Sequence, residues 1–336
     1  MEISRELESF GEAIERLRVA IGTTVVGQER VVHEILVSLV AGGHALLEGA
    51  PGLGKTLLVR TLADCLKLRF SRIQFTPDLM PSDVTGTNVI VEAEDGRKRF
   101  EFQPGPIFGN VVLADEINRA TPKTQSALLE AMQELGVTVA GERHVLEAPF
   151  FVLATQNPIE MEGTYPLPEA QLDRFFFKVL VAPPDEETMV RIVEATTGAA
   201  APAPTPVLDG PRLLAMSGLA RSVPVAEPLV RYVARLVRAT QPEGAESAAV
   251  ARKYVRYGAG VRAAQAIVLG AKVTALMAGR AHVAFEDLRA VAKPAMRHRL
   301  VLNFEGEAEG IGTDTIVDQV LAELPDMPAE VTRLES

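Results

Sequence analysis

The sequence of 336 residues has no tryptophan and only one cysteine, Cys65. A single cysteine cannot form an internal disulfide, and its apolar helical surroundings predict a buried thiol. Aromatic residues make up 5% of the chain, which offers few platforms for stacked nucleic-acid bases. The chain also lacks a run of about 18 apolar residues, so no direct membrane insertion is expected. Residues 1–17 are charged and helical in period, unlike a signal peptide, and we therefore expect a cytoplasmic protein.

Basic residues are outnumbered by acidic ones, 34 Lys and Arg against 44 Asp and Glu, which gives a net charge of −10 at pH 7. That balance argues against a broad surface for the phosphates of a nucleic acid, and no nucleic-acid partner is expected. The apolar share of 47% and the charged share of 23% are typical of a globular protein. The length is sufficient for two or three domains with their own cores.

Short apolar strands and helices alternate in the first half of the chain. Strands are predicted at residues 44–48, 70–75, 110–114, 150–155 and 175–181, with helices at 55–66 and 121–135. This order predicts an α/β domain with a parallel sheet over residues 1–182. Beyond it, residues 183–336 predict a smaller, all-helical domain, with helices at 229–240, 262–280 and 285–297 and a Pro/Ala loop at 198–210.

The segment GAPGLGKT lies between the first predicted strand and the helix that follows it. It matches all four fixed positions of the phosphate-binding loop, and the strand-to-helix context is the one that this loop requires. Its backbone N–H groups and the helix N-terminus would face phosphates, Lys55 would reach the β- and γ-phosphates, and the Thr56 hydroxyl would bind Mg²⁺. The predicted ATP-binding residues of the loop are Gly49, Ala50, Pro51, Gly52, Leu53, Gly54, Lys55 and Thr56.

Acidic and polar residues follow the later strands. Asp115 and Glu116 end an apolar strand, where open α/β sheets bind ligands. We expect Asp115 to hold Mg²⁺ and Glu116 to polarise the attacking water. Asn157, in the segment ATQNP, could contact the γ-phosphate or the water, although Asn-Pro alone more often marks a turn. The pair Asp173-Arg174 is most often a surface ion pair when it is considered alone.

Together these segments resemble the AAA+ ATPase superfamily, and within it the MoxR family, over nearly the whole chain. The resemblance is carried by VVGQERVV (25–32), GAPGLGKT (49–56), QFTPDLMPSDVTG (74–86), FQPGPIFGNVVLADEINRA (102–120), ATQNP (154–158), GTYPLPEAQLDRF (163–175) and YGAGVRAAQA (257–266). It implies an AAA+ P-loop core of the helix-2-insert clade, followed by a helical lid.

The resemblance also assigns roles to individual residues. It implies that Val26, Gly27 and Gln28 pack against adenine and that Asn157 is sensor 1. Arg174 looks like the arginine finger that reaches the ATP of a neighbouring subunit. Arg262 looks like sensor 2, which would touch the γ-phosphate of its own subunit's ATP. One departure is that residues 258–262 read Gly-Ala-Gly-Val-Arg where the family usually has Gly-Ala-Ser-Pro-Arg, so the helix start has lost a cap.

Two β-hairpins are predicted as insertions. Residues 84–102 contain two strand-like runs around a polar turn at 94–97 and resemble the helix-2 insert. Residues 137–146, with Gly141-Glu142 at the turn, resemble the hairpin before sensor 1. In ring ATPases such hairpins face the pore or the partner, although they could also simply extend the sheet.

The resemblance implies a ring-forming chaperone, a hexamer, that hydrolyses ATP to remodel a partner with a von Willebrand factor A domain and a client enzyme. A nucleic-acid motor related to minichromosome-maintenance helicases and a magnesium-chelatase-like motor subunit are the alternatives. The five histidines have no ligand spacing, so no metal site is expected beyond the nucleotide's Mg²⁺. The arginine-rich segment MRHRLVLNF (296–304) is interpreted as a solvated or interface surface.

Overall fold

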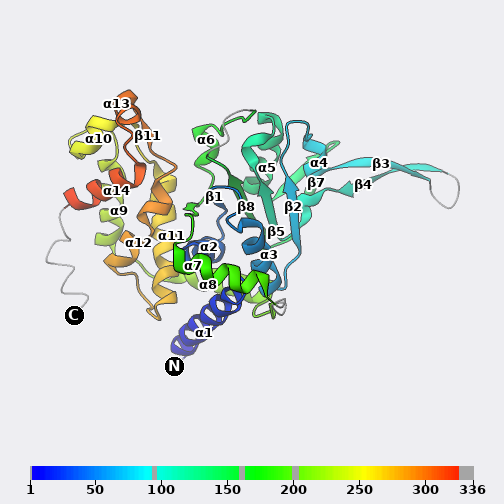
Figure 1. Ribbon diagram of the computed structural model, residues 1–336, viewed down its shortest axis with the longest axis horizontal. Coiled ribbons are helices and arrows are strands. Elements are labelled where there is room, and N and C mark those ends of the chain that lie inside the picture. Colours follow the sequence, from blue (N-terminus) through cyan, green and yellow to red (C-terminus); the bar gives the residue numbers. More distant parts are fainter. Residues whose placement is uncertain (1, 93–96, 159–162, 199–203, 325–336) are drawn as a thin grey trace.

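A five-stranded parallel sheet organises the first half of the chain in the computed structural model, which describes residues 2–92, 97–158, 163–198 and 204–324 (Figure 1). The strands are β1 (Ala45–Glu48), β2 (Phe70–Gln74), β5 (Val111–Asp115), β8 (Phe151–Gln156) and β9 (Phe177–Leu180). Their order is β2-β5-β8-β1-β9, and every neighbouring pair is parallel. The three central strands are apolar and almost fully buried, because both faces of the sheet are covered.

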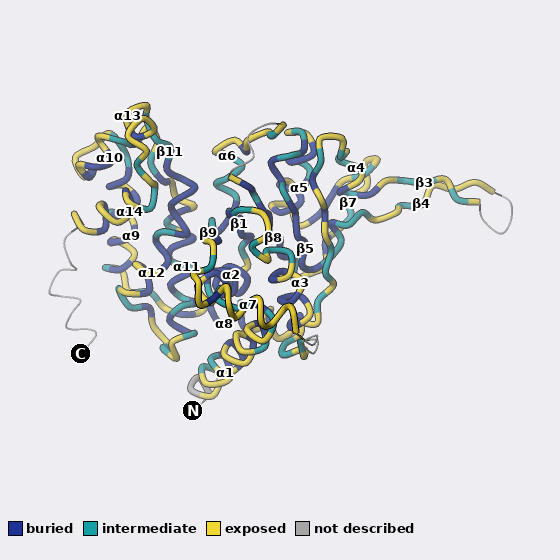
Figure 2. Tube along the Cα trace, viewed as in Figure 1, coloured by how far each residue is buried: buried dark blue, intermediate teal, exposed yellow. Residues whose placement is uncertain are grey.

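Each face of the sheet contributes to a different hydrophobic core, because alternate side chains of a strand point to opposite faces. Leu47 and Leu113 pack on one side with α1 (Glu2–Gly22), α2 (Glu29–Ala41) and α3 (Lys55–Cys65). The neighbouring strand positions, such as Leu46 and Val112, pack on the other side with α4 (Pro81–Thr85) and α5 (Pro122–Glu134). Figure 2 shows the buried stretches running through the strands and through a long helix of the second half. Cys65 is fully buried, as predicted.

Two hairpins leave the sheet, and both had been predicted. β3 (Gly86–Glu92) pairs with β4 (Lys98–Pro104) and projects far from the body of the molecule (Figure 1). The predicted turn of this hairpin at 94–97 lies mostly outside the described residues, which omit 93–96. β6 (Gly136–Val139) pairs with β7 (Glu142–Val145). Its turn is at Ala140 and Gly141 rather than at Gly141-Glu142, because these two residues have the positive φ values, 50° and 86°, that a type I′ hairpin turn needs.

The second half of the chain is mostly helical and forms the lid. Its elements are α7 (Glu186–Thr197), α8 (Gly210–Ser222), α9 (Glu227–Ala239), α10 (Ala249–Tyr254), β10 (Val255–Tyr257), α11 (Val261–Met277), α12 (Phe285–Met296), β11 (Val301–Leu302), α13 (Phe304–Ala308) and α14 (Thr313–Glu323). The short antiparallel pair β10–β11 corrects the prediction of an all-helical domain. The lid helices share one continuous core with α1, α2 and α3, so the division at residue 182 stays a prediction.

Short elements complete the connections: η1 (Pro106–Phe108), η2 (Ile117–Arg119) and α6 (Glu169–Leu172). Within the described ranges, no single helix has the length and apolar character to cross a bilayer. Taken together, helices α8 and α9 have the length and apolar composition of a membrane span, but they are bent by 94° relative to each other.

Candidate functional site

The glycine-rich segment forms a loop between β1 and α3, as the sequence predicts. Gly54 caps α3 with a φ of 74°, a left-handed conformation that glycine adopts without steric cost. Lys55 begins the helix, and its ammonium group donates to the carbonyls of Gly49 at 2.6 Å and Ala50 at 2.9 Å. The loop therefore curls around the lysine, and the N-terminus of α3 adds its partial positive charge in the same place.

Asp115 and Glu116 follow at the carboxyl end of β5, which is separated from β1 by β8 in the sheet. The Asp115 carboxylate accepts a hydrogen bond from the Thr155 hydroxyl at 2.7 Å. The same hydroxyl accepts from the Glu116 backbone N–H at 2.8 Å. Glu116 has a φ of 56°, a strained value for a residue with a side chain, and such strain is often found where a side chain is aimed at a ligand.

Polar neighbours that were not predicted hold these two carboxylates. Arg72 donates to Asp115 Oδ2 from Nη2 at 2.7 Å and from Nε at 3.2 Å. Gln74 donates to Glu116 Oε2 at 3.1 Å, and Arg119 donates to the same oxygen at 3.0 Å. The sequence carries a weak indication of this, because Arg72 and Gln74 alternate around a buried Ile73 and so share one face at the end of β2.

One cavity of about 350 Å³ brings the predicted phosphate and hydrolysis residues together. Residues 51–57, Asp115, Glu116, Thr155 and Asn157 line it. Asn157 is only 4% exposed, so its amide is held inside this polar pocket. The loop lysine is partly buried here, and burial lowers its pKa while Asp115 and Glu116 act to raise it.

The residues of this cavity fit a magnesium ion that arrives with a nucleotide. Thr56 contributes a hydroxyl oxygen and Asp115 a carboxylate oxygen, which are the ligands that Mg²⁺ prefers. Among the described residues, no group of three or more His, Cys, Asp or Glu side chains could hold a metal. A Mg²⁺ ion would therefore depend on phosphate oxygens and water for its remaining ligands, as is usual for nucleotide sites.

A second cavity of about 580 Å³ adjoins the first and shares residues 52–54 and Leu57 with it. Val26, Gly27 and Gln28, the predicted adenine contacts, line it together with α7. Gln28 is anchored by a hydrogen bond to the Leu53 carbonyl at 2.7 Å. A side chain at Gly27 would collide with Thr188, whose methyl carbon would lie 2.0 Å from the added Cβ. The close approach of α7 thus closes an apolar compartment beside the phosphate loop.

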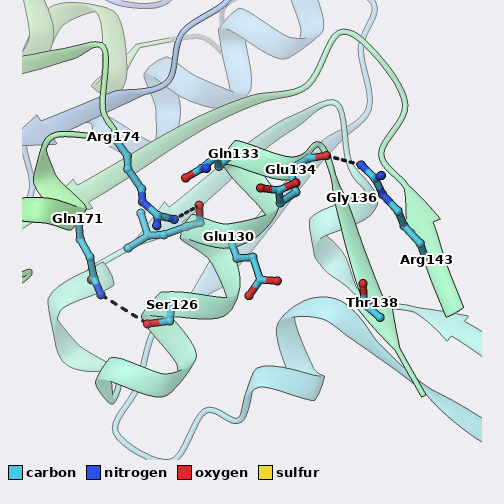
Figure 3. A pocket seen from close by; sticks show the side chains of 10 residues that line it. Ser126, Glu130, Gln133, Glu134, Gly136, Thr138, Arg143, Gln171 and Arg174 are labelled. Carbon is cyan, nitrogen blue, oxygen red and sulfur yellow. Dashed lines mark hydrogen bonds between the residues drawn. The ribbon is translucent and has the colours of Figure 1, made fainter. Parts of the chain in front are cut away.

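The two predicted arginines lie elsewhere. Within the described ranges, neither Arg174 nor Arg262 lines the phosphate cavity or the apolar cavity. Arg174 lines a separate hollow of about 570 Å³ beside α5 and the β6–β7 hairpin, where Nη1 donates to the Leu129 carbonyl at 2.8 Å (Figure 3). Arg262 pairs instead with Asp173, with 3.2 Å between Nη1 and Oδ2. The expected approach of Arg262 to the phosphates of its own subunit is therefore not seen in this conformation.

The arginine-rich segment before β11 corrects the sequence interpretation of a solvated or interface surface. Arg297, His298 and Arg299 are 4%, 7% and 8% exposed. His298 contacts the Phe175 carbonyl through Nε2 at 3.1 Å, and burial holds its pKa well below the usual value. The two arginines bind backbone carbonyls and carboxylates at the boundary between lid and sheet, whereas Nδ1 of His298 is buried without a hydrogen-bond partner among the described residues.

A phosphate loop, an acidic pair at a strand end and a helical lid define the class of AAA+ ATPases. The family model of the ATPase family associated with various cellular activities (AAA) matches residues 44–177, and the AAA lid domain matches residues 247–320. Sequence relatives then identify the family more narrowly.

The chain is 42% identical over 308 residues to chaperone MoxR1 of Mycobacterium tuberculosis, covering 92% of this chain and 81% of that protein. It is 33% identical to protein MoxR of Paracoccus denitrificans, covering 91% and 94% of the two chains. A crystal structure of a proposed ATPase from Cytophaga hutchinsonii superposes with a TM-score of 0.87 and 39% identity, over 96% of this chain and 98% of the other. The protein belongs to the MoxR family of AAA+ ATPases.

Proposed function

We propose that this ATPase is the motor of a ring-forming chaperone that remodels or matures partner proteins. The chaperone role is supported by a relative that covers 92% of the chain and is named as a chaperone. The partner with a von Willebrand factor A domain, the client enzyme and the hexameric ring rest on the family resemblance alone, and the cytoplasmic location stays a proposal.

The roles proposed for hydrolysis follow from the residues gathered in the phosphate cavity. Lys55 and the loop N–H groups bind the phosphates, Asn157 orients the γ-phosphate or the water, and the Glu116 carboxylate takes the proton of the attacking water. Thr56 and Asp115 would hold Mg²⁺, which neutralises developing phosphate charge when it is bound. Gln74 and Arg119 both contact Oε2 of Glu116, which leaves Oε1 to accept the proton of the water.

Arg174 does not line the phosphate cavity of its own chain, and this observation supports the proposal that subunits assemble into a ring. None of the described arginines lines the cavity, and we infer that a second subunit supplies a guanidinium that completes the charge stabilisation. Arg174 lines a hollow beside α5 and the β6–β7 hairpin, which a neighbouring subunit could meet. The role of Arg262 as sensor 2 at the ATP of its own subunit stays a proposal, which requires the lid to bring this arginine to the phosphates.

Mixing of two inactive variants tests this proposal. Lys55→Ala subunits carry Arg174 but bind no ATP, whereas Arg174→Ala subunits bind ATP but have no finger. A finger contributes roughly 10³–10⁵ in turnover, so each variant alone should be nearly inactive. Mixed rings, verified by native mass spectrometry, should regain ATPase activity at interfaces where the first variant donates Arg174 to the second. Absence of rescue in such rings would contradict a role in trans.

Among the residues that the structure describes, no observation favours the nucleic-acid or chelatase alternatives. DNA binding no stronger than the salt-sensitive range of roughly 10⁻⁴–10⁻⁶ M is expected, and a tight complex at physiological salt would reopen the motor alternative.

A further inference from the structure

We propose that Arg299 is a positioning residue through which the lid fixes Arg174 for catalysis in the neighbouring subunit. This inference rests on the proposed function, because it assumes that Arg174 acts in trans. Arg299 follows α12 in the lid, whereas Arg174 lies between α6 and β9, at the edge of the sheet. The two residues are far apart in sequence, and the contacts between their segments are built entirely by the fold.

The guanidinium of Arg299 binds the chain immediately before and after Arg174. It donates to Asp173 Oδ1 at 2.7 Å and to the Asp173 carbonyl at 3.1 Å. On the other side it donates to the carbonyls of Phe175 at 2.6 Å and Phe176 at 3.2 Å. A planar guanidinium with five donors can make such a set of contacts, whereas a lysine ammonium cannot reproduce its geometry. Arg299 therefore holds the backbone on both sides of Arg174.

Burial makes this connection hard to break. Arg299 is 8% exposed, and a buried cation requires partners that replace its hydration. Asp173 is its carboxylate partner, and the same carboxylate also accepts from Arg262 of α11 through its other oxygen. Two lid arginines thus converge on the residue that precedes Arg174. A displacement of the lid would therefore move Asp173 and the backbone from which the Arg174 side chain extends.

The lid also contacts the nucleotide site of its own subunit. Helix α7 lines the apolar cavity, and Arg297 donates to the Lys178 carbonyl at 2.9 Å. The Lys178 ammonium pairs with Glu48, which precedes the phosphate loop, at 2.8 Å. The lid therefore contacts both the backbone around Arg174 and the nucleotide site of its own subunit.

The experiment uses donor subunits that bind no ATP and acceptor subunits that lack the finger. Acceptors carry Arg174→Ala, and donors carry Lys55→Ala alone or together with Arg299→Lys. Arg299→Lys keeps the positive charge but loses the planar set of N–H donors that binds several carbonyls at once. Displacement of a reacting group by about 1 Å can lower a rate by about 10²-fold. The Arg299→Lys donor should therefore lower the acceptor turnover by about 10²-fold, relative to the Lys55→Ala donor. The KM for ATP should not change, because the acceptor keeps its own loop.

A matched control separates positioning from general damage to the lid. Arg297→Lys changes an equally buried arginine that contacts Lys178 and Asp314 but is bonded to none of residues 173–176. Donors with this change should rescue like the Lys55→Ala donor. Equal loss with both lysine variants, or an altered KM, would overturn the positioning role, as would full rescue by the Arg299→Lys donor.

A second donor variant, Asp173→Asn, tests the same contact if Arg299→Lys does not fold. It keeps the side-chain volume and removes the charge at a side chain that is 34% exposed. It should lower the acceptor turnover by the same factor. Thermal melting and native mass spectrometry establish folding and ring entry for each donor. If the Lys55→Ala donor itself gives no rescue, the trans role of Arg174 fails first and this inference fails with it. If that donor rescues, the Arg299 and Asp173 variants test the inference alone.

Discussion

Thr155 and Asp115 are joined by a buried hydrogen bond of 2.7 Å between the threonine hydroxyl and Oδ1. Because the same hydroxyl accepts from the Glu116 N–H, one side chain sets both the carboxylate and the left-handed backbone of the next residue. Thr155→Val has the same shape but leaves a buried donor and a buried acceptor without this partner. We expect a loss of about 1–3 kcal/mol in the free energy of unfolding and a clear fall in kcat. Thr155→Ser keeps the hydroxyl and should therefore retain both the stability and kcat. An unchanged kcat in the valine variant would contradict the role of Thr155.

Lys55→Ala should abolish nucleotide binding. The change removes the only loop side chain that carries a positive charge into the phosphate cavity, where the helix N-terminus alone attracts anions weakly. Isothermal calorimetry with ATP and ADP provides the measurement. Lys123→Ala, at an exposed lysine of α5, is the matched control and should bind as the unchanged protein does. Tight ATP binding by the Lys55 variant would rule out the assignment of the loop.

Glu116→Gln should keep ATP bound but lose roughly 10² or more in turnover, because the amide cannot accept the proton of the attacking water. The substitution keeps the size of the side chain and one oxygen that Gln74 and Arg119 can still contact. Single-turnover hydrolysis and equilibrium binding separate the two effects. Weaker binding with normal turnover of the bound ATP would show that Glu116 has another role.

The sheet and the phosphate cavity could be predicted because their signals are local. Each central strand is a short apolar run, and the loop residues lie in one continuous segment after β1. Asp115 and Asn157 were predicted at this site because the carboxyl ends of parallel strands share one edge. The turn of the β6–β7 hairpin shifted by one residue, since sequence alone does not fix which two residues take positive φ.

Contacts between distant segments could not be predicted in the same way. Asp173 and Arg299 are separated by 126 positions, and nothing in the segment MRHRLVLNF indicates that the lid turns its arginines inward. A dense run of arginine is usually solvated, because a buried guanidinium needs several carbonyl or carboxylate partners. Those partners exist here only because α12 ends beside β9. Similarly, Arg72 reaches Asp115 only because β2 is the neighbour of β5 in the sheet.

His44 should make the stability of the protein depend on pH. Its ring is buried, with Nδ1 accepting from the Val152 N–H at 3.0 Å and Nε2 facing the Met132 carbonyl at 3.2 Å. This arrangement requires a neutral imidazole with its proton on Nε2, because protonation of Nδ1 would replace the acceptor with a second donor. Burial accordingly lowers the pKa of His44 from 6.5 to about 4.

Between the unfolded pKa of 6.5 and the folded pKa of about 4, the unfolded chain therefore binds more protons than the folded chain. The contribution of His44 to stability is present above pH ~6.5 and is lost as the pH falls toward ~4. Lowering the pH from 7.5 to 5 should cost about 2 kcal/mol at this residue, since one pKa unit corresponds to about 1.4 kcal/mol. Urea unfolding of the unchanged protein and of His44→Gln at both pH values measures the difference. On acidification, the free energy of unfolding of His44→Gln should fall by about 2 kcal/mol less than that of the unchanged protein. His298 is also held neutral by burial, but it is present in both proteins and therefore does not affect this difference. Equal losses in the two proteins would show that His44 does not contribute.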